Sequence, residues 1–267
     1  MGHLQANVNR FSGFAECYDG ARPQPPAVIV DVLTHMAGVE EPALVVDIGS
    51  GTGLSTRIWG GRAREIIGIE PNPDMRAEAE RQTPADRDVS YREGTSTQTG
   101  LPDECADIVT AVQSLHWMEP EGTFAEAARV LRPCGVFSAI DCDWPPVVHP
   151  ELDAAYVEMR RHVEELQKAT GVYDSVKRWP KTSHLDNMRA SGRFSYVREL
   201  FAHQVDSGDA RRYMGLVHSQ GGIVALLKRG CSEPEIGMDR LREVAERVMG
   251  GRVIPWYYSY RIRMGIK

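Results

Sequence analysis

The sequence predicts an α/β fold, a Rossmann-like doubly wound sheet of seven mostly parallel strands with an antiparallel edge strand and an inserted helical cap. Between residues 41 and 141, short apolar runs alternate with amphipathic stretches, as in parallel strands joined by crossover helices. A glycine-rich turn at residues 49–53 follows the first apolar run. After Asp141 the prolines at 145, 146 and 150 favour a loop, and longer helical patterns follow.

A helix is predicted ahead of the core. Pro25 and Pro26 mark its start, and apolar residues recur at helical spacing over residues 28–36. Each of three predicted strands is followed by a predicted helix, in the order 43–48 and 54–59, 65–69 and 73–81, and 106–112 and 122–131. A fourth strand at residues 136–140 ends this region.

The C-terminal part predicts mostly helices, at residues 151–168, 183–190, 209–229 and 233–249. Two strands interrupt them, because residues 194–204 alternate and residues 253–266 are rich in Trp, Tyr and Ile. We therefore expect an N-terminal segment with a helix (1–40), a Rossmann-like core (41–141), and a helical substrate cap that includes the final strands (142–267).

The composition excludes several classes of protein. With 267 residues, a net charge of −6 and 42% hydrophobic residues, the chain resembles an ordinary soluble globular protein. Its longest apolar runs fall far short of the roughly 20 residues that cross a bilayer, and residues 1–10 lack an apolar stretch behind a basic region. We expect no membrane partner and a cytoplasmic location. No basic stripe with interleaved aromatics occurs, so we expect no nucleic acid partner.

The most specific signal is the motif D-x-G-x-G-x-G from Asp47 to Gly53, where an apolar strand runs into a predicted helix. Glycines let the backbone approach a ligand closely, and a helix start offers unpaired N–H groups. Leu54 occupies the third position of a nicotinamide fingerprint, and the loop has no lysine for a P-loop. Glu70 ends the next strand, where a carboxylate can accept both hydroxyls of a ribose.

Taken together, these motifs resemble class I S-adenosylmethionine-dependent methyltransferases, in the small-molecule branch (methyltransferase type 11) that includes trans-aconitate methyltransferase-like proteins. Further matching segments follow in order at residues 69–75, 93–96, 101–102, 106–109 and 130–135, and an upstream Y-x-x-x-R-P lies at residues 18–23. The resemblance covers about residues 11–141. One departure is Cys134, where the family commonly has a small residue.

The resemblance implies S-adenosyl-L-methionine as cofactor and S-adenosyl-L-homocysteine as product. It places the glycine loop at the methionine part, Glu70 at the ribose, Met75 at the adenine face, and Arg22 near the cofactor carboxylate. The implied cofactor-binding residues are Tyr18, Arg22, Asp47, Gly49, Ser50, Gly51, Gly53, Glu70, Pro71, Met75, Thr95, Ser96 and Gln113. Met75 could instead be a packing residue.

In an open α/β sheet the acceptor lies beyond the carboxyl ends of the strands, here after Val112 and Ile140. His116 is the candidate general base, although it could instead bond a loop carbonyl. Asp141 is a second catalytic candidate. The candidate substrate residues are Trp117, Trp144, Tyr173, Trp179, Tyr213, His218 and Trp256. We expect no metal, because residues 113–117 supply no acidic partner for Asp141.

These observations predict methyl transfer to an O or N atom of a small-molecule metabolite, such as one of secondary metabolism, by in-line displacement. The alternatives are C-methylation, with Asp141 as proton acceptor, and a non-catalytic cofactor-binding module. In related enzymes an N/D-P-P-Y/F element accompanies methylation of adenine or glutamine amino groups. No such element follows Val112, which counts against these acceptors. We expect a monomer or homodimer.

Overall fold

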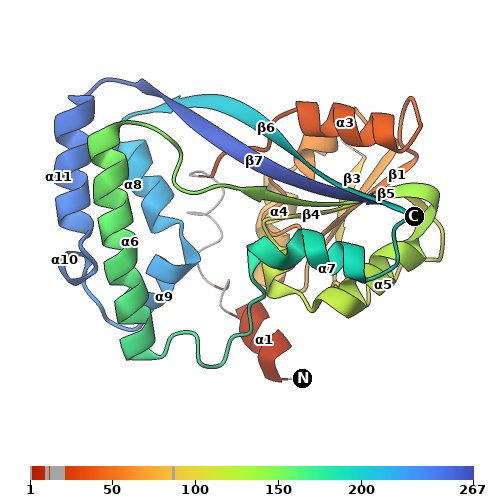
Figure 1. The fold of residues 1–267 in the computed structure, drawn as a ribbon, viewed down its shortest axis with the longest axis horizontal. Coiled ribbons are helices and arrows are strands. Elements are labelled where there is room, and N and C mark those ends of the chain that lie inside the picture. Colours follow the sequence, from red (N-terminus) through yellow and green to blue (C-terminus); the bar gives the residue numbers. More distant parts are fainter. Residues whose placement is uncertain (1, 10–11, 13–21, 86–87) are drawn as a thin grey trace. The chain divides into compact units, whose positions relative to one another are not determined.

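The computed structural model describes residues 2–9, 12, 22–85 and 88–267. Its seven-stranded sheet has the order β3-β2-β1-β4-β5-β7-β6 (Figure 1). The strands are β1 Leu44–Ile48, β2 Glu65–Ile69, β3 Val89–Arg92, β4 Ala106–Val112, β5 Leu131–Cys142, β6 Tyr196–Gly208 and β7 Ile254–Ile266. Strands β1 to β5 are parallel, and β7 is antiparallel to β5. The predicted fold class is confirmed.

The strand order reverses between β1 and β4, because β2 and β3 lie on one side of β1 while β4 and β5 lie on the other. Open α/β sheets bind ligands beyond the carboxyl ends of the strands at this switch point. The carboxyl ends of β1, β2 and β4 are therefore the expected place for a ligand.

The chain divides into two compact units. The sheet unit comprises residues 24–142, 178–202 and 260–267. The helical unit comprises the described residues before 24, together with residues 143–177 and 203–259.

Helices cover both faces of the sheet unit, as the near-continuous apolar strands require. Its helices are α3 Val28–Met36, α4 Pro73–Gln82, α5 Pro120–Val130 and α7 His184–Ala190, with short 3-10 helices η1 Arg57–Trp59, η2 Leu115–Trp117 and η3 Lys181–Ser183. Figure 1 shows α3 on the opposite side of the sheet from α5 and α7. On the α5 side, Phe137 stacks on Phe194, and both contact Phe124 edge-on, so aromatic packing joins α5 and β5 to the segment before β6.

The helix expected at residues 54–59 is wrong. The structure has turns there and only the 3-10 helix η1. Arg57 Nη1 donates to the Thr52 carbonyl at 2.6 Å, so a side chain pairs with this backbone acceptor. The hydroxyls of Ser55 and Thr56 donate to the Asp47 side chain, and such local bonds compete with helix formation.

Other element predictions differ from the structure in smaller ways. The four-residue strand β3 was not predicted, because its side chains are only half-buried or exposed and give no apolar run. The helix expected at residues 209–229 is broken into α8 Ala210–His218 and α9 Gly221–Lys228. The strands expected at residues 194–204 and 253–266 correspond to β6 and β7.

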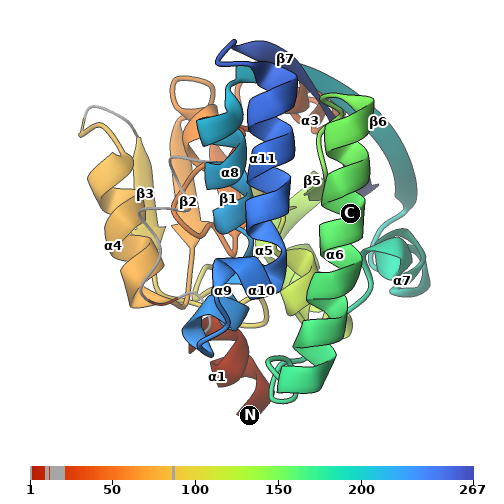
Figure 2. The ribbon, with the colours of Figure 1, turned by 90° about the vertical axis from the view of Figure 1, so that its left-hand side faces the viewer.

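Three long helices of the helical unit lie side by side, because α11 (Met238–Met249) packs against both α6 (Pro150–Thr170) and α8 (Figure 2). The apolar side chains Leu241, Val244 and Met249 of α11 are buried. The short helices α1 Gly2–Asn9 and α10 Glu233–Ile236 complete the unit. Among the described residues, no helix is both long and apolar enough to span a bilayer.

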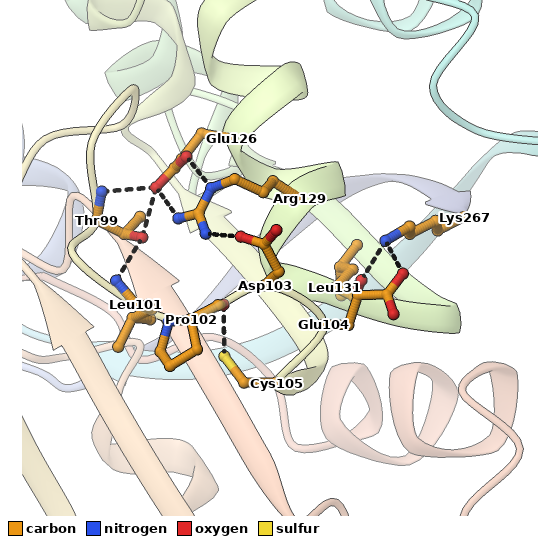
Figure 3. Close-up of polar contacts among 10 residues, drawn as sticks. All are labelled: Thr99, Leu101, Pro102, Asp103, Glu104, Cys105, Glu126, Arg129, Leu131 and Lys267. Carbon is orange, nitrogen blue, oxygen red and sulfur yellow. Dashed lines mark hydrogen bonds and ion pairs between the residues drawn. The ribbon is translucent and has the colours of Figure 1, made fainter.

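A fully paired polar network fixes the loop that leads into β4 (Figure 3). Glu126 of α5 accepts hydrogen bonds from the backbone N–H and hydroxyl of Thr99 and pairs with Arg129 at 2.7 Å. Arg129 also contacts Asp103 at 2.5 Å. Arg129 is the main reason that the pKa of Glu126 is lowered to about 2.

Candidate cofactor and acceptor site

The glycine loop connects β1 to η1, and three of its glycines adopt left-handed φ angles, 69° at Gly49, 55° at Gly51 and 81° at Gly53. Side chains favour this conformation poorly, which explains the three glycines. A methyl group on Gly49 would overlap Ser114, and one on Gly53 would overlap Tyr91. At Gly51 it would meet nothing within 4 Å, so this glycine borders open space.

The side chain of Asp47 links the segments on either side of the glycine loop to β4. Its buried carboxylate accepts hydrogen bonds from the hydroxyls of Ser55, Thr56 and Thr110 at 2.7, 2.7 and 2.8 Å. Burial raises the pKa of Asp47, and the three hydroxyl bonds oppose that rise. Asp47 therefore joins β1, β4 and the segment after the glycine loop.

Glu70 connects the end of β2 to the same loop. One carboxylate oxygen accepts the Gly51 N–H at 3.0 Å, and the other accepts the Asn72 N–H at 2.8 Å. Burial raises the pKa of Glu70, while the two backbone bonds lower it. Each carboxylate oxygen has a second lone pair, so the group can still accept ribose hydroxyls.

Two hydroxyls of the loop provide a direct test of whether S-adenosylmethionine fits. Ser50 Oγ and Thr52 Oγ1 are buried and have no hydrogen-bond partner within the described part of the chain. Buried polar atoms without partners are costly in a folded protein. With the open space at Gly51 and the Glu70 carboxylate, these hydroxyls fit a polar ligand such as the amino-acid and ribose parts of this cofactor.

The residues predicted near the adenine follow β2 and β3. Met75 lies in the first turn of α4, where it is 2% exposed and donates its N–H to the Asn72 side chain at 3.1 Å. Ser96 accepts a hydrogen bond from the Thr123 hydroxyl at 2.9 Å, and Thr95 pairs with Gln98. Pro71 directly follows Glu70. Their roles toward adenine stay predictions.

The end of β4 brings three predicted acceptor residues together in the sheet unit. The rings of His116 and Trp117, both in η2, lie 4.7 Å apart. The His116 carbonyl accepts the N–H of Trp179 at 2.9 Å, although 63 positions separate the two residues in the chain. His116, Trp117 and Trp179 thus form one cluster beyond the end of β4.

Asp141, near the end of β5, is held between two cations. Lys181 Nζ and Arg263 Nη1 each lie 2.8 Å from one of its oxygens. Lys181 also donates to the Gln113 side chain at 2.5 Å. No local sequence pattern predicts that Lys181 and Arg263 contact Asp141, because both are distant from it in the chain.

The other predicted substrate residues lie in the helical unit. The rings of Tyr213 and Trp256 meet edge-on at 5.8 Å, and both side chains are buried. Trp144 meets Tyr258 edge-on at 6.1 Å. Tyr173 lies close to Gly222, because a methyl group on Gly222 would be 3.0 Å from the Tyr173 hydroxyl.

Two predicted binding residues have protein partners inside the helical unit. His218 bonds the Met214 carbonyl and Glu233, each at 2.8 Å. Arg22 donates to the Ser219 side chain and carbonyl, both at 3.0 Å, and its guanidinium lies 4.9 Å from the Trp144 ring centroid. Tyr18 lies outside the described residues.

Comparison with known proteins agrees with this geometry. Residues 46–139 match the family model of a methyltransferase domain. The chain is 32% identical over 132 residues to a methyltransferase-like protein of Schizosaccharomyces pombe, covering 49% of this chain and 50% of that protein. It is 30% identical over 183 residues to sterol 24-C-methyltransferase of Yarrowia lipolytica, covering 66% of this chain and 46% of that enzyme. The chain thus spans about half the length of these curated relatives.

A solved structure extends the likeness over nearly the whole chain. A protein of Anaeromyxobacter dehalogenans, provisionally assigned as a type II methyltransferase, superposes with a TM-score of 0.66 at 21% identity, covering 92% of this chain and 97% of that one. At this identity the likeness concerns the fold. The family match shows that residues 46–139 form a methyltransferase domain, and the fold is that of the class I S-adenosylmethionine-dependent methyltransferases.

Proposed function

We propose that this protein transfers a methyl group from S-adenosylmethionine to an O or N atom of a small-molecule metabolite by in-line displacement. The observation that carries the proposal is the pair of buried hydroxyls of Ser50 and Thr52, which have no partner among the described residues and lie in the glycine loop that Glu70 contacts. The trans-aconitate methyltransferase-like branch stays a prediction.

The cofactor, when bound, supplies the methyl group as a sulfonium. Asp47, Ser50 and the three glycines would hold its methionine part, Glu70 its ribose, and Met75, Thr95 and Ser96 its adenine. Because Asp47 and Glu70 are already fixed by hydrogen bonds to the loop, little reorganisation is needed when the ligand binds.

His116 is the residue we propose for taking a proton from an attacking hydroxyl or N–H group. It follows β4, beyond the strand end where the acceptor is expected, its ring lies beside that of Trp117, and its carbonyl accepts the backbone N–H of Trp179. Indole rings can position a planar acceptor and exclude water. Asp141 is less suited to this role, since both of its oxygens are engaged by cations.

C-methylation is the second candidate. The similarity to sterol 24-C-methyltransferase, which extends over 66% of this chain, favours it. The two candidates share the cofactor site and differ in the acceptor. Mass spectrometry and NMR of the methylated product separate them, because the methyl carbon resonates differently on O, N and C.

Calorimetric titration with S-adenosylmethionine and S-adenosylhomocysteine tests the cofactor. We expect micromolar binding, and Glu70→Ala should weaken it about tenfold or more, equivalent to about 1.4 kcal/mol. Glu80→Ala, a change at an exposed carboxylate of α4, is the matched control and should leave both affinities unchanged. Absence of binding by the wild-type protein would contradict the proposal.

Turnover is tested by a metabolite screen with isotopically labelled S-adenosylmethionine. If His116 is the general base, His116→Ala and His116→Gln should both lower turnover by about 100-fold or more. Both variants should leave cofactor binding intact. Tight cofactor binding without methylation of any acceptor would favour a non-catalytic binding module.

A further inference from the structure

Gln113 follows β4 with an unusual backbone conformation, one residue before Ser114, which contacts the glycine loop. Its φ angle is 55°, a left-handed value that side chains adopt at a cost. The next residue, Ser114, donates its hydroxyl to the Ile48 carbonyl at 2.9 Å and lies where a methyl group on Gly49 would overlap it. Gln113 therefore directly precedes the residue that contacts the first glycine of the loop, whereas Glu70 contacts the loop at Gly51.

Three hydrogen bonds hold Gln113 in this conformation. Its N–H donates to the Ile140 carbonyl at 2.8 Å, and Nε2 donates to the Cys142 carbonyl at 3.1 Å. The side-chain oxygen accepts from Lys181 Nζ at 2.5 Å. The acceptors of the first two bonds are backbone carbonyls of β5, so Lys181 supplies the one side chain in the set.

Lys181 is in turn held by a chain of ion pairs. Its Nζ lies 2.8 Å from Asp141 Oδ1, while the other oxygen of Asp141 pairs with Arg263, and Arg263 Nε lies 2.9 Å from Glu199. The side chains of Asp141 and Arg263 are 5% and 4% exposed, so each charge depends on its partners. The chain of contacts runs from β6 through β7 and β5 to the end of β4.

His184 faces the same group of charges. It is 1% exposed, and neither ring nitrogen has a partner among the described residues. Burial lowers the pKa of His184 to about 4, with Asp141 opposing and Arg263 and Lys181 adding to the decrease. At neutral pH the imidazole is uncharged, so Asp141 is left to pair with the lysine and the arginine.

We propose that Lys181 is a positioning residue, which holds Gln113 so that it forms the methionine end of the cofactor site, and that Asp141 and Arg263 fix Lys181 for this task. This inference rests on the proposed function. It concerns the glycine-loop end of the site next to β4, because Glu70 contacts the loop on the side of β2.

Two ligands that differ only at that end test the inference. S-Adenosylhomocysteine carries the amino-acid part, whereas 5′-methylthioadenosine has the same adenine and ribose without it. Lys181→Met should weaken binding of S-adenosylhomocysteine by about fivefold or more and change that of 5′-methylthioadenosine by less than about twofold. Asp141→Asn should act in the same direction, and Lys181→Arg should retain most of the affinity because it keeps a cationic donor.

Lys168→Met, a change at an exposed lysine of α6, is the matched control and should leave both affinities unchanged. Thermal unfolding of each variant checks that it is folded. If wild-type protein binds S-adenosylhomocysteine and Lys181→Met binds it equally well, the inference is overturned and the proposed function stands. An equal loss for both ligands also overturns it, since that result marks a structural role. If wild-type protein binds neither ligand, the proposed function fails and the inference fails with it.

Discussion

Two polar clusters of the sheet unit use similar residues with different results. In the network around Glu126 and Arg129, Thr99 donates both its backbone N–H and its hydroxyl to one carboxylate (Figure 3). In the glycine loop, the buried hydroxyls of Ser50 and Thr52 have no such partner in the described structure. The first cluster fixes a loop, whereas the second retains hydrogen-bonding capacity that a ligand can use.

Disrupting the network around Glu126 and Arg129 should have the largest effect on the free energy of unfolding. Glu126→Gln removes the charge that pairs with Arg129, so we expect the free energy of unfolding to fall by about 1–3 kcal/mol. Urea denaturation measures this loss. Glu80→Gln on α4 serves as control and should change stability little. Affinity for S-adenosylhomocysteine should be unchanged, and a large loss of affinity would mean that the two clusters are not independent.

Acid should weaken the same network in a defined pH range. The pKa of Glu126 is lowered from 4.5 to about 2, chiefly by its hydrogen bond with Arg129. A lowered pKa means that the stabilisation is complete above pH 4.5 and is lost as the pH falls toward 2. Urea denaturation between pH 5 and pH 2 should show a shallower decline in Glu126→Gln than in wild-type protein, and parallel declines would contradict this account.

Filling the open space at Gly51 should affect binding more than stability. A left-handed alanine costs about 1 kcal/mol of folding free energy, and the added methyl group meets no protein atom within 4 Å. We therefore expect Gly51→Ala to remain folded and to weaken S-adenosylhomocysteine binding about tenfold, by occupying ligand space. Unchanged affinity would show that this space is not part of the site.

Removing a buried hydroxyl from the loop should have the smallest effect, of opposite sign on folding and on binding. Thr52→Val keeps the side-chain shape and removes an unpaired polar atom, so the free energy of unfolding should rise by about 0.5–1 kcal/mol. Calorimetry should show affinity for S-adenosylhomocysteine decreasing about threefold to tenfold. A loss of stability instead would indicate that the hydroxyl has a structural partner.

The predictable part of the site is local in sequence. Asp47 lies near the end of β1, the glycines follow that end, and Glu70 follows the end of β2, so strand order alone brings them to one edge. Lys181 and Arg263 act through Gln113 and Asp141, at separations of 68 and 122 residues, and no local pattern records such contacts.

The errors in the predicted secondary structure have other causes. The segment after the glycine loop has helical spacing. However, the Arg57 side chain bonds the Thr52 carbonyl, and the hydroxyls of two residues in the segment bond Asp47, and such local bonds compete with helix formation. Strand β3 lies at one end of the strand order and lacks a buried apolar run, so only its pairing with β2 identifies it.

Amide chemical-shift mapping on addition of S-adenosylhomocysteine tests the central contrast most directly. We predict large shifts for the amides of Ser50, Gly51, Thr52 and Glu70, and little change for those of Thr99 and Arg129. Shifts centred on the paired network, or no shifts in the glycine loop at saturating ligand, would contradict the assignment of the loop as the cofactor site.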